Sequence, residues 1–125
     1  PQEIGNYKVV QFKICNQPYL RFGREKYQDI IIEFAKIIEV SFIWGVNGRP
    51  IGFDPKERSF RTVGAGECDF RGTRAIFYGK SDSLDNLEIN KMHLESLKQF
   101  SGGIEIIYSP NHDPNKRTQY DEYYL

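Results

Sequence analysis

The segment at residues 24–40, REKYQDIIIEFAKIIEV, constrains the fold most strongly, because it decides between an all-β chain and one that contains helices. Its isoleucines alone would suit a strand. Its polar positions recur at spacings of three, four and three, which mixes the two faces of a strand but keeps to one face of a helix. The polar positions are Lys26, Asp29, Glu33 and Lys36, and the apolar stripe opposite them is Tyr27, Ile30, Ile31, Phe34, Ile37 and Ile38. This pattern predicts an amphipathic helix.

The rest of the chain consists mainly of β-branched and aromatic runs separated by turn residues. Strands are predicted at residues 6–15, 19–22, 41–46, 49–53, 59–63, 73–79 and 103–109. A second helix is predicted within 84–101, where leucines and Phe100 share one face and Gly102 follows as a C-cap. We therefore expect a single α+β domain over residues 1–125, with a mixed, mostly antiparallel sheet and both helices packed on one face. Residues 110–125 form a polar, Tyr-rich C-terminal tail.

Composition excludes several classes of partner and cofactor. Seventeen basic and seventeen acidic residues cancel, which argues against bulk DNA or an anionic membrane. No apolar run approaches the ~20 residues of a membrane span, and the N-terminus lacks the features of a signal peptide. The histidines, cysteines and acids show no metal-ligand spacing, so no metal or cofactor is expected. Cys15 and Cys68 are too few for a disulfide framework, and as free thiols they favour the cytoplasm. Nothing in the sequence decides the oligomeric state.

The stretch VGAGECDFRGTR, residues 63–74, is the main candidate for a ligand site. Consecutive small residues at Gly64, Ala65 and Gly66 can turn backbone N–H groups into one concavity, and such nests bind anions. Arg71 and Arg74 follow and could supply charge and bidentate hydrogen bonds. The alternative is a glycine-rich turn with two solvated arginines. The cysteine within this stretch lies between two acids, which raises a thiol pKa and makes a poor nucleophile.

His112, in the sequence SPNHDP after the last predicted strand, is the candidate catalytic residue. A loop that follows a strand holds its side chains on a rigid base, and Asp113 could orient the imidazole ring. The alternative is a turn built from Asn, Asp and Pro. His93, in the second predicted helix, is expected to be exposed or hydrogen-bonded. The tail mixes bases with tyrosines, which suits single-stranded RNA or a protein interface, or else a terminus without a binding role.

The order of elements resembles the janus/ocnus family of phosphohistidine phosphatases. GNYKVVQFKI is similar to the opening strand of that family, VGAGEC and IFYGKS resemble its glycine-rich segment and following strand, and HLESLKQFSGGIEIIYS resembles its last helix and strand. The family's catalytic histidine falls on Gln28, which follows Tyr27. The arginine of the family's glycine segment falls on Glu67, its downstream histidine falls near Phe70, and residues 41–61 look like an insertion. The resemblance implies the fold and a vestigial anion pocket, without phosphatase activity.

Two other families share short motifs with the chain. RGTRAIFYGKSD together with SPNHDP resembles barnase-like ribonucleases, in which Arg74 would bind phosphate and His112 would be the general acid; Glu57 and Glu67 are both out of register with the catalytic glutamate. KYQDIIIEF and SDSLDNLEI resemble jacalin-type β-prism lectins, whose motif needs glycine where Glu25 and Ser81 stand. That kinship would turn both predicted helices into strands.

The sequence thus favours a non-catalytic binding module for a phosphate-bearing ligand or a protein partner. No complete catalytic constellation supports an enzyme. The alternatives are a metal-free endoribonuclease that acts on RNA and a carbohydrate-binding lectin.

Overall fold

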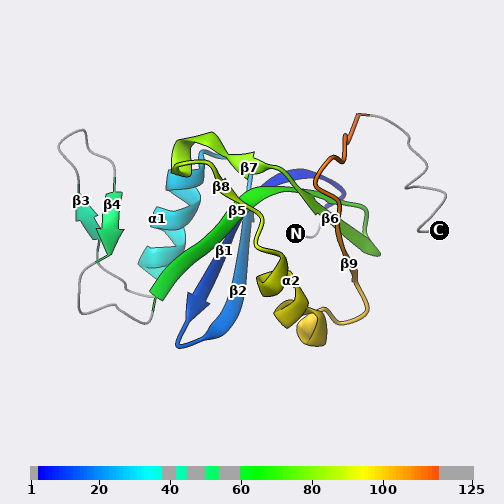
Figure 1. The fold of residues 1–125 in the computed structure, drawn as a ribbon, viewed down its shortest axis with the longest axis horizontal. Coiled ribbons are helices and arrows are strands. Elements are labelled where there is room, and N and C mark those ends of the chain that lie inside the picture. The colour runs from blue at the N-terminus through cyan, green and yellow to red at the C-terminus, as the bar shows by residue number, and fades with distance from the viewer. Residues whose placement is uncertain (1–2, 38–41, 45–49, 54–59, 116–125) are drawn as a thin grey trace.

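The computed structural model describes residues 3–37, 42–44, 50–53 and 60–115 (Figure 1). The elements are β1 (Gly5–Ile14), β2 (Gln17–Gly23), α1 (Tyr27–Ile37), β3 (Phe42–Trp44), β4 (Pro50–Phe53), β5 (Phe60–Phe70), β6 (Arg74–Tyr78), β7 (Lys80–Ser81), η2 (Asp82–Leu84), β8 (Leu87–Glu88), α2 (Lys91–Leu97), η3 (Lys98–Phe100) and β9 (Glu105–Tyr108). Five strands form one sheet in the order β2-β1-β5-β6-β9, in which only the β6–β9 pair is parallel. Two short ladders, β3–β4 and β7–β8, lie outside it. The expected α+β domain with a mixed, mostly antiparallel sheet is confirmed.

The first hairpin follows directly from its turn residues. Cys15 and Asn16 connect β1 to β2, and both have positive φ, 49° and 66°. A two-residue hairpin loop of this kind matches the twist of the strands it joins, and asparagine tolerates the left-handed conformation well. The register that results pairs Ile14 with Gln17 and continues along both strands.

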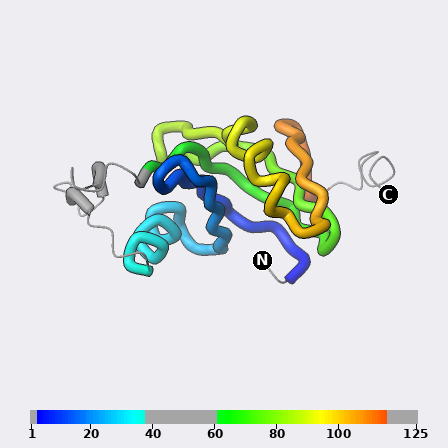
Figure 2. Tube along the Cα trace, turned by 90° about the horizontal axis from the view of Figure 1, so that it is seen from below, coloured from blue at the N-terminus to red at the C-terminus, as the bar shows by residue number. Residues whose placement is uncertain are grey.

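The two helices lie on opposite faces of the sheet, which corrects the expectation that both would cover one face. Val9 and Val10 are neighbours on β1 and therefore point to opposite sides. Val9 belongs to the core cluster that contains Leu94 of α2, whereas Val10 packs with Ile30 and Ile31 of α1. Figure 2 shows α1 and α2 on either side of the strands.

The physical reason for this arrangement is that β1 is buried on both sides. Residues 9–12, with the sequence VVQF, all have zero exposed surface. A strand buried on both faces carries a continuous run of buried residues instead of an alternating one. Such a strand needs a cover on each face, and one helix covers each. The cover on the α1 side includes the close ring contact of Phe12 with Phe34, whose centroids are 4.6 Å apart.

The second helix is much shorter than predicted. Instead of one helix over 84–101, the chain forms η2, then β8, then the seven-residue α2 and the short η3. Asp85 and Asn86 have φ of 55° and 58°, which breaks the helical path. Asn90 then caps α2 by accepting a hydrogen bond from the backbone N–H of His93. Leucine spacing alone predicted a helix across this break.

Candidate functional site

Residues Gly64, Ala65 and Gly66 lie in the middle of β5, so the predicted anion nest at a turn is wrong. They pair with residues 9–11 of β1, and β5 continues to residue 70. Glycine usually weakens a strand, which is why the sequence predicted that the strand ended there. The glycines are instead explained by close approach. A Cβ at Gly66 would lie 2.6 Å from Ile89 Cγ1, and one at Gly64 would collide with the amide oxygen of Gln11.

A buried polar network occupies the space beside Gly64. The Gln11 side chain has no exposed surface. Its Oε1 accepts a hydrogen bond from the backbone N–H of Asn90 at 2.6 Å, and its Nε2 donates to the Asn90 carbonyl at 3.0 Å. The same Nε2 contacts His93 Nδ1 at 3.1 Å, while His93 Nε2 lies 2.9 Å from the Phe12 carbonyl.

This network fixes the chemical state of His93. The Phe12 carbonyl can only accept, so Nε2 carries the proton and Nδ1 accepts from Gln11. Burial also lowers the pKa of His93, and this effect outweighs the hydrogen bond to the Phe12 carbonyl, which raises that pKa. A neutral imidazole whose two nitrogens are both engaged is structural. It joins α2 to the sheet and has no spare nitrogen for catalysis.

The two candidate arginines have different surroundings. Arg71 is engaged by Asp69, whose Oδ2 accepts from Arg71 Nη2 at 2.9 Å and from Nε at 3.2 Å. Arg74 is half-buried at the start of β6, and its carbonyl accepts the backbone N–H of Arg71 across the turn. Because residues 64–66 lie inside β5 and form no nest, the two arginines that follow this strand adjoin no concave anion site of backbone N–H groups there.

His112 is brought to Asp69 by the fold, a contact that the sequence did not predict. Its Nε2 lies 2.8 Å from Asp69 Oδ2, and its side chain has no exposed surface. Burial raises the pKa of Asp69, but hydrogen bonds from Arg71 and His112 outweigh it and lower that pKa below the ordinary value. The backbone N–H of His112 also donates to Ser109, which closes the turn expected from SPNHDP.

This Asp–His–Arg cluster fastens the segment after β9 onto the sheet. A general acid must reach within hydrogen-bond distance of the reacting atom. A fully buried His112 does not meet that requirement in this conformation. The geometry therefore favours the alternative in which the SPNHDP segment is a turn, with the histidine anchoring it. No signal in the sequence links residues 69 and 112, which lie forty-three positions apart.

Two further side chains, those of Cys68 and Tyr27, are held in unreactive states. Burial, with a smaller contribution from Asp69, raises the pKa of the Cys68 thiol. Cys68 is buried and Cys15 is exposed, and both are free. Burial followed by the charge of Glu67 raises the pKa of Tyr27 to about 12, so this phenol stays protonated and donates to the Gly66 carbonyl. The described residues contain no group of three or more His, Cys, Asp or Glu side chains placed to hold a metal ion.

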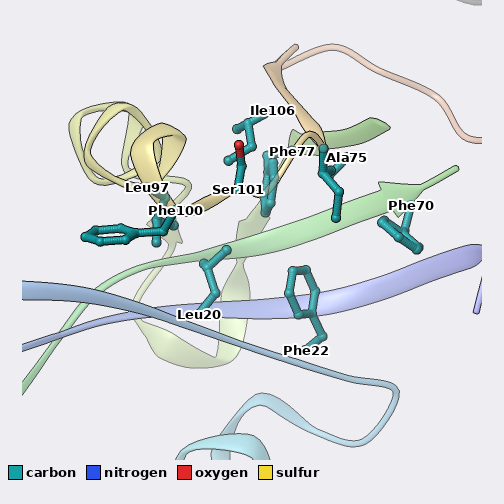
Figure 3. Close-up of a pocket in the computed structure, with 10 residues that line it drawn as sticks. Leu20, Phe22, Phe70, Ala75, Phe77, Leu97, Phe100, Ser101 and Ile106 are labelled. Atoms are coloured by element: carbon teal, nitrogen blue, oxygen red, sulfur yellow. The ribbon is translucent and has the colours of Figure 1, made fainter. Parts of the chain in front are cut away.

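An apolar pocket lies on the face of the sheet that carries α2 (Figure 3). Its volume is about 250 Å³. The described residues that line it are Leu20, Phe22, Phe70, Ala75, Phe77, Leu97, Phe100, Ser101, Ile104 and Ile106. Phe77 at its floor is fully buried, whereas Phe100 at its rim is 61% exposed. One hydroxyl, that of Ser101, is the only side-chain polar group among these described lining residues.

The pocket exists because α2 is too short for the face it covers. Seven residues of helix span roughly 10 Å at 1.5 Å per residue. The eleven residues of β5 span roughly 36 Å at 3.3 Å per residue. The apolar face of the sheet extends beyond α2 as far as Ala75 and Phe70, and η3 and the following turn cover only part of this remainder. The concave apolar region that results has the composition usual for small-molecule sites.

The sequence could have identified the pocket's walls but not the pocket. Leu20 and Phe22 stand on either side of Arg21, and residues 75–78, AIFY, form a continuous apolar run, so both strands are predicted to have a buried face. Whether that face is fully covered depends on the length of the helix opposite. The sequence predicted one helix within 84–101, where the structure has the end of η2, then β8, α2 and η3.

Several expectations concern residues beyond the part of the chain that the structure describes. The Tyr-rich tail from residue 116 onward is outside it, so its proposed role as a stacking surface stays a prediction. Among the described residues, no helix is long and apolar enough to cross a membrane.

The comparisons with known proteins do not decide between the families named above. The chain matches no family model, and no curated protein matches it. The resemblances to the janus/ocnus family and to barnase-like ribonucleases stay predictions. A β-prism is wrong, because α1 occupies the segment KYQDIIIEF that this fold would need as a strand, and the main sheet is a single five-stranded one.

Proposed function

We propose that this protein is a non-catalytic binding module whose ligand site is the apolar pocket between α2, η3 and the sheet. The observation that carries this proposal is the pocket itself: about 250 Å³ of space with four phenylalanines among its described lining residues. A dry apolar cavity of ~150 Å³ is large enough to bind benzene. The space here is larger, and an apolar ligand that entered it would remove both its own surface and the pocket walls from water.

The state of the polar groups supports binding over catalysis. His93 and His112 are buried and hydrogen-bonded within the fold, and Cys68 is buried with a raised pKa. A phosphate-bearing ligand, the class expected from the sequence, loses its main support because the nest is a strand and Arg71 is bound to Asp69. A ribonuclease loses support because His112 is inaccessible. We therefore keep the proposal of a binding module and replace the anionic ligand with an apolar one.

Two exposed apolar side chains, Met92 on α2 and Phe100 on η3, offer a matched test. Phe100 lines the pocket and Met92 does not, although Met92 is 82% exposed and also large and apolar. Full burial of a phenylalanine side chain contributes about 1.5–3 kcal/mol, so the partly exposed Phe100 contributes about 1 kcal/mol to a bound ligand. We expect Phe100→Ala to weaken binding of a neutral fluorescent probe about fivefold and Met92→Ala to leave it unchanged. Equal effects of the two variants would place binding elsewhere.

A cavity-filling variant separates binding from folding. Ala75 lies on β6, 5% exposed and facing the pocket, and Ala75→Ile adds three carbons into that space. Each buried CH₂ group contributes about 0.8 kcal/mol, so the melting temperature should hold or rise while probe binding is lost. A misfolded variant would lose both properties. Retained probe binding with an unchanged or higher melting temperature would contradict the pocket as the site.

A further inference from the structure

The polarity of the pocket indicates which ligands it can accept. Among its described lining residues there is no charged side chain. The lysine next to the rim, Lys98, forms an ion pair with Glu95, with 3.2 Å between Nζ and Oε1. Glu105, which precedes a lining residue on β9, is exposed and acidic. An anion that entered this pocket would leave water without gaining a cation.

Three hydrogen-bond donors of the rim residues Ser101 and Ile104 are already used. The Ser101 hydroxyl donates to the Lys98 carbonyl at 2.9 Å, and the Ser101 backbone N–H donates to the same carbonyl at 3.3 Å. The backbone N–H of Ile104 donates to the Ser101 carbonyl at 3.2 Å. The Ser101 hydroxyl oxygen still has lone pairs, so it can accept a hydrogen bond from a ligand. The rim therefore suits an N–H or O–H of a ligand better than a carboxylate, sulfonate or phosphate oxygen.

The walls favour an aromatic ligand. Four phenylalanine rings, those of Phe22, Phe70, Phe77 and Phe100, are spread along the lining of the pocket. The rings of Phe22 and Phe77 are tilted by 43° with centroids 6.2 Å apart. Such a tilt presents both ring edges and ring faces to an aromatic ligand. Edge-to-face and offset-stacked ring pairs are both stabilising.

On these grounds we infer that the pocket selects neutral aromatic molecules with a single hydrogen-bond donor and discriminates against anions of the same shape. This inference rests on the proposed function, since it concerns the same pocket. It extends that function by naming the ligand class. It also runs against the phosphate-bearing ligand that the sequence suggested.

A matched pair of fluorescent probes tests the inference. N-phenyl-1-naphthylamine is neutral and carries one N–H, and 8-anilino-1-naphthalenesulfonate is the same aromatic skeleton with a sulfonate added. Both become more fluorescent in apolar surroundings, so each can be titrated directly into the full chain. We expect the amine to bind at least tenfold more tightly than the sulfonate. The affinity of the sulfonate is taken only from the bound sulfonate that the amine displaces, because that fraction occupies the pocket.

The outcomes separate the two proposals. If both probes bind with similar affinity and displace one another, the selectivity is overturned while the pocket stands. If neither probe binds, the proposed function is overturned together with the inference. A second variant checks the cause: Ser101→Lys places a cation at the rim and should reduce the tenfold difference. If the difference is unchanged in this variant, the missing cation is not what excludes the sulfonate, and the inference is overturned.

Discussion

The sharpest stability prediction concerns Gln11, the buried amide that joins β1 to the start of α2. In Gln11→Met, a side chain of similar length fills the same space but carries no amide. Three contacts are lost, to the N–H and carbonyl of Asn90 and to His93 Nδ1, at 2.6, 3.0 and 3.1 Å. A buried polar group left without a partner costs about 1–3 kcal/mol. His93 is 1% exposed, whereas Asn90 is half-buried and water can replace part of what it loses.

We therefore expect Gln11→Met to lower the free energy of unfolding by roughly 2–4 kcal/mol, a large part of the 5–15 kcal/mol usual for a domain. Urea unfolding measures this as a lower midpoint with an unchanged slope. The control is Gln99→Met, because Gln99 is exposed and its amide makes one long bond to Ser96 at 3.3 Å. That control should change stability by no more than about 0.5 kcal/mol. A loss below about 1 kcal/mol in Gln11→Met would refute the account of the network.

Three further predictions follow from other buried contacts. Gly66→Ala should destabilise the fold by more than about 1 kcal/mol in urea, because the new Cβ would lie 2.6 Å from both Ile89 Cγ1 and the Tyr78 carbonyl; an unchanged midpoint would contradict the close approach. The pKa of His93 is lower in the folded protein than in the unfolded chain, so as the pH falls the unfolded chain binds a proton at a higher pH than the folded protein does. Stability should therefore be full above pH 6.5 and decline as the pH falls below that value. The variant His93→Gln should have a flatter pH profile, and an identical profile would exclude His93 as the cause. Asp69→Asn removes the charge that faces Arg71 and His112 and should lower the free energy of unfolding by roughly 1–3 kcal/mol. Thermal unfolding at neutral pH measures this change, and an unchanged stability would show that the cluster does not stabilise the fold.

Local sequence patterns determined which segments form most of the elements. The mixed-parity spacing of polar residues in 24–40 led to α1, observed at Tyr27–Ile37, because a helix is the regular structure that places those positions on one side. The alternating and β-branched runs led to β1, β2, β6 and β9 within a few residues of their ends. Together these runs were enough to establish the α+β class and a largely antiparallel sheet.

Tertiary structure decided what each element packs against, and with it the nature of the site. Gly64 and Gly66 looked like a turn because glycine has no local preference for a strand; only the approach of residues 89 and 90 explains why a strand needs glycine there. The opposite placement of the helices depends on β1 being buried on both faces. α1 covers the face that carries Val10 and Phe12, and α2 covers the face that carries Val9.

The candidate site changed for the same reason. His112 and Asp69 meet through the parallel pairing of β9 with β6 next to β5, a contact between distant residues that no local pattern encodes. The apolar pocket arises from a mismatch between a seven-residue helix and a wide sheet, which is a property of two elements together. Sequence periodicity shows which side of an element is apolar. The lengths and positions of its neighbours decide how much of that side stays open.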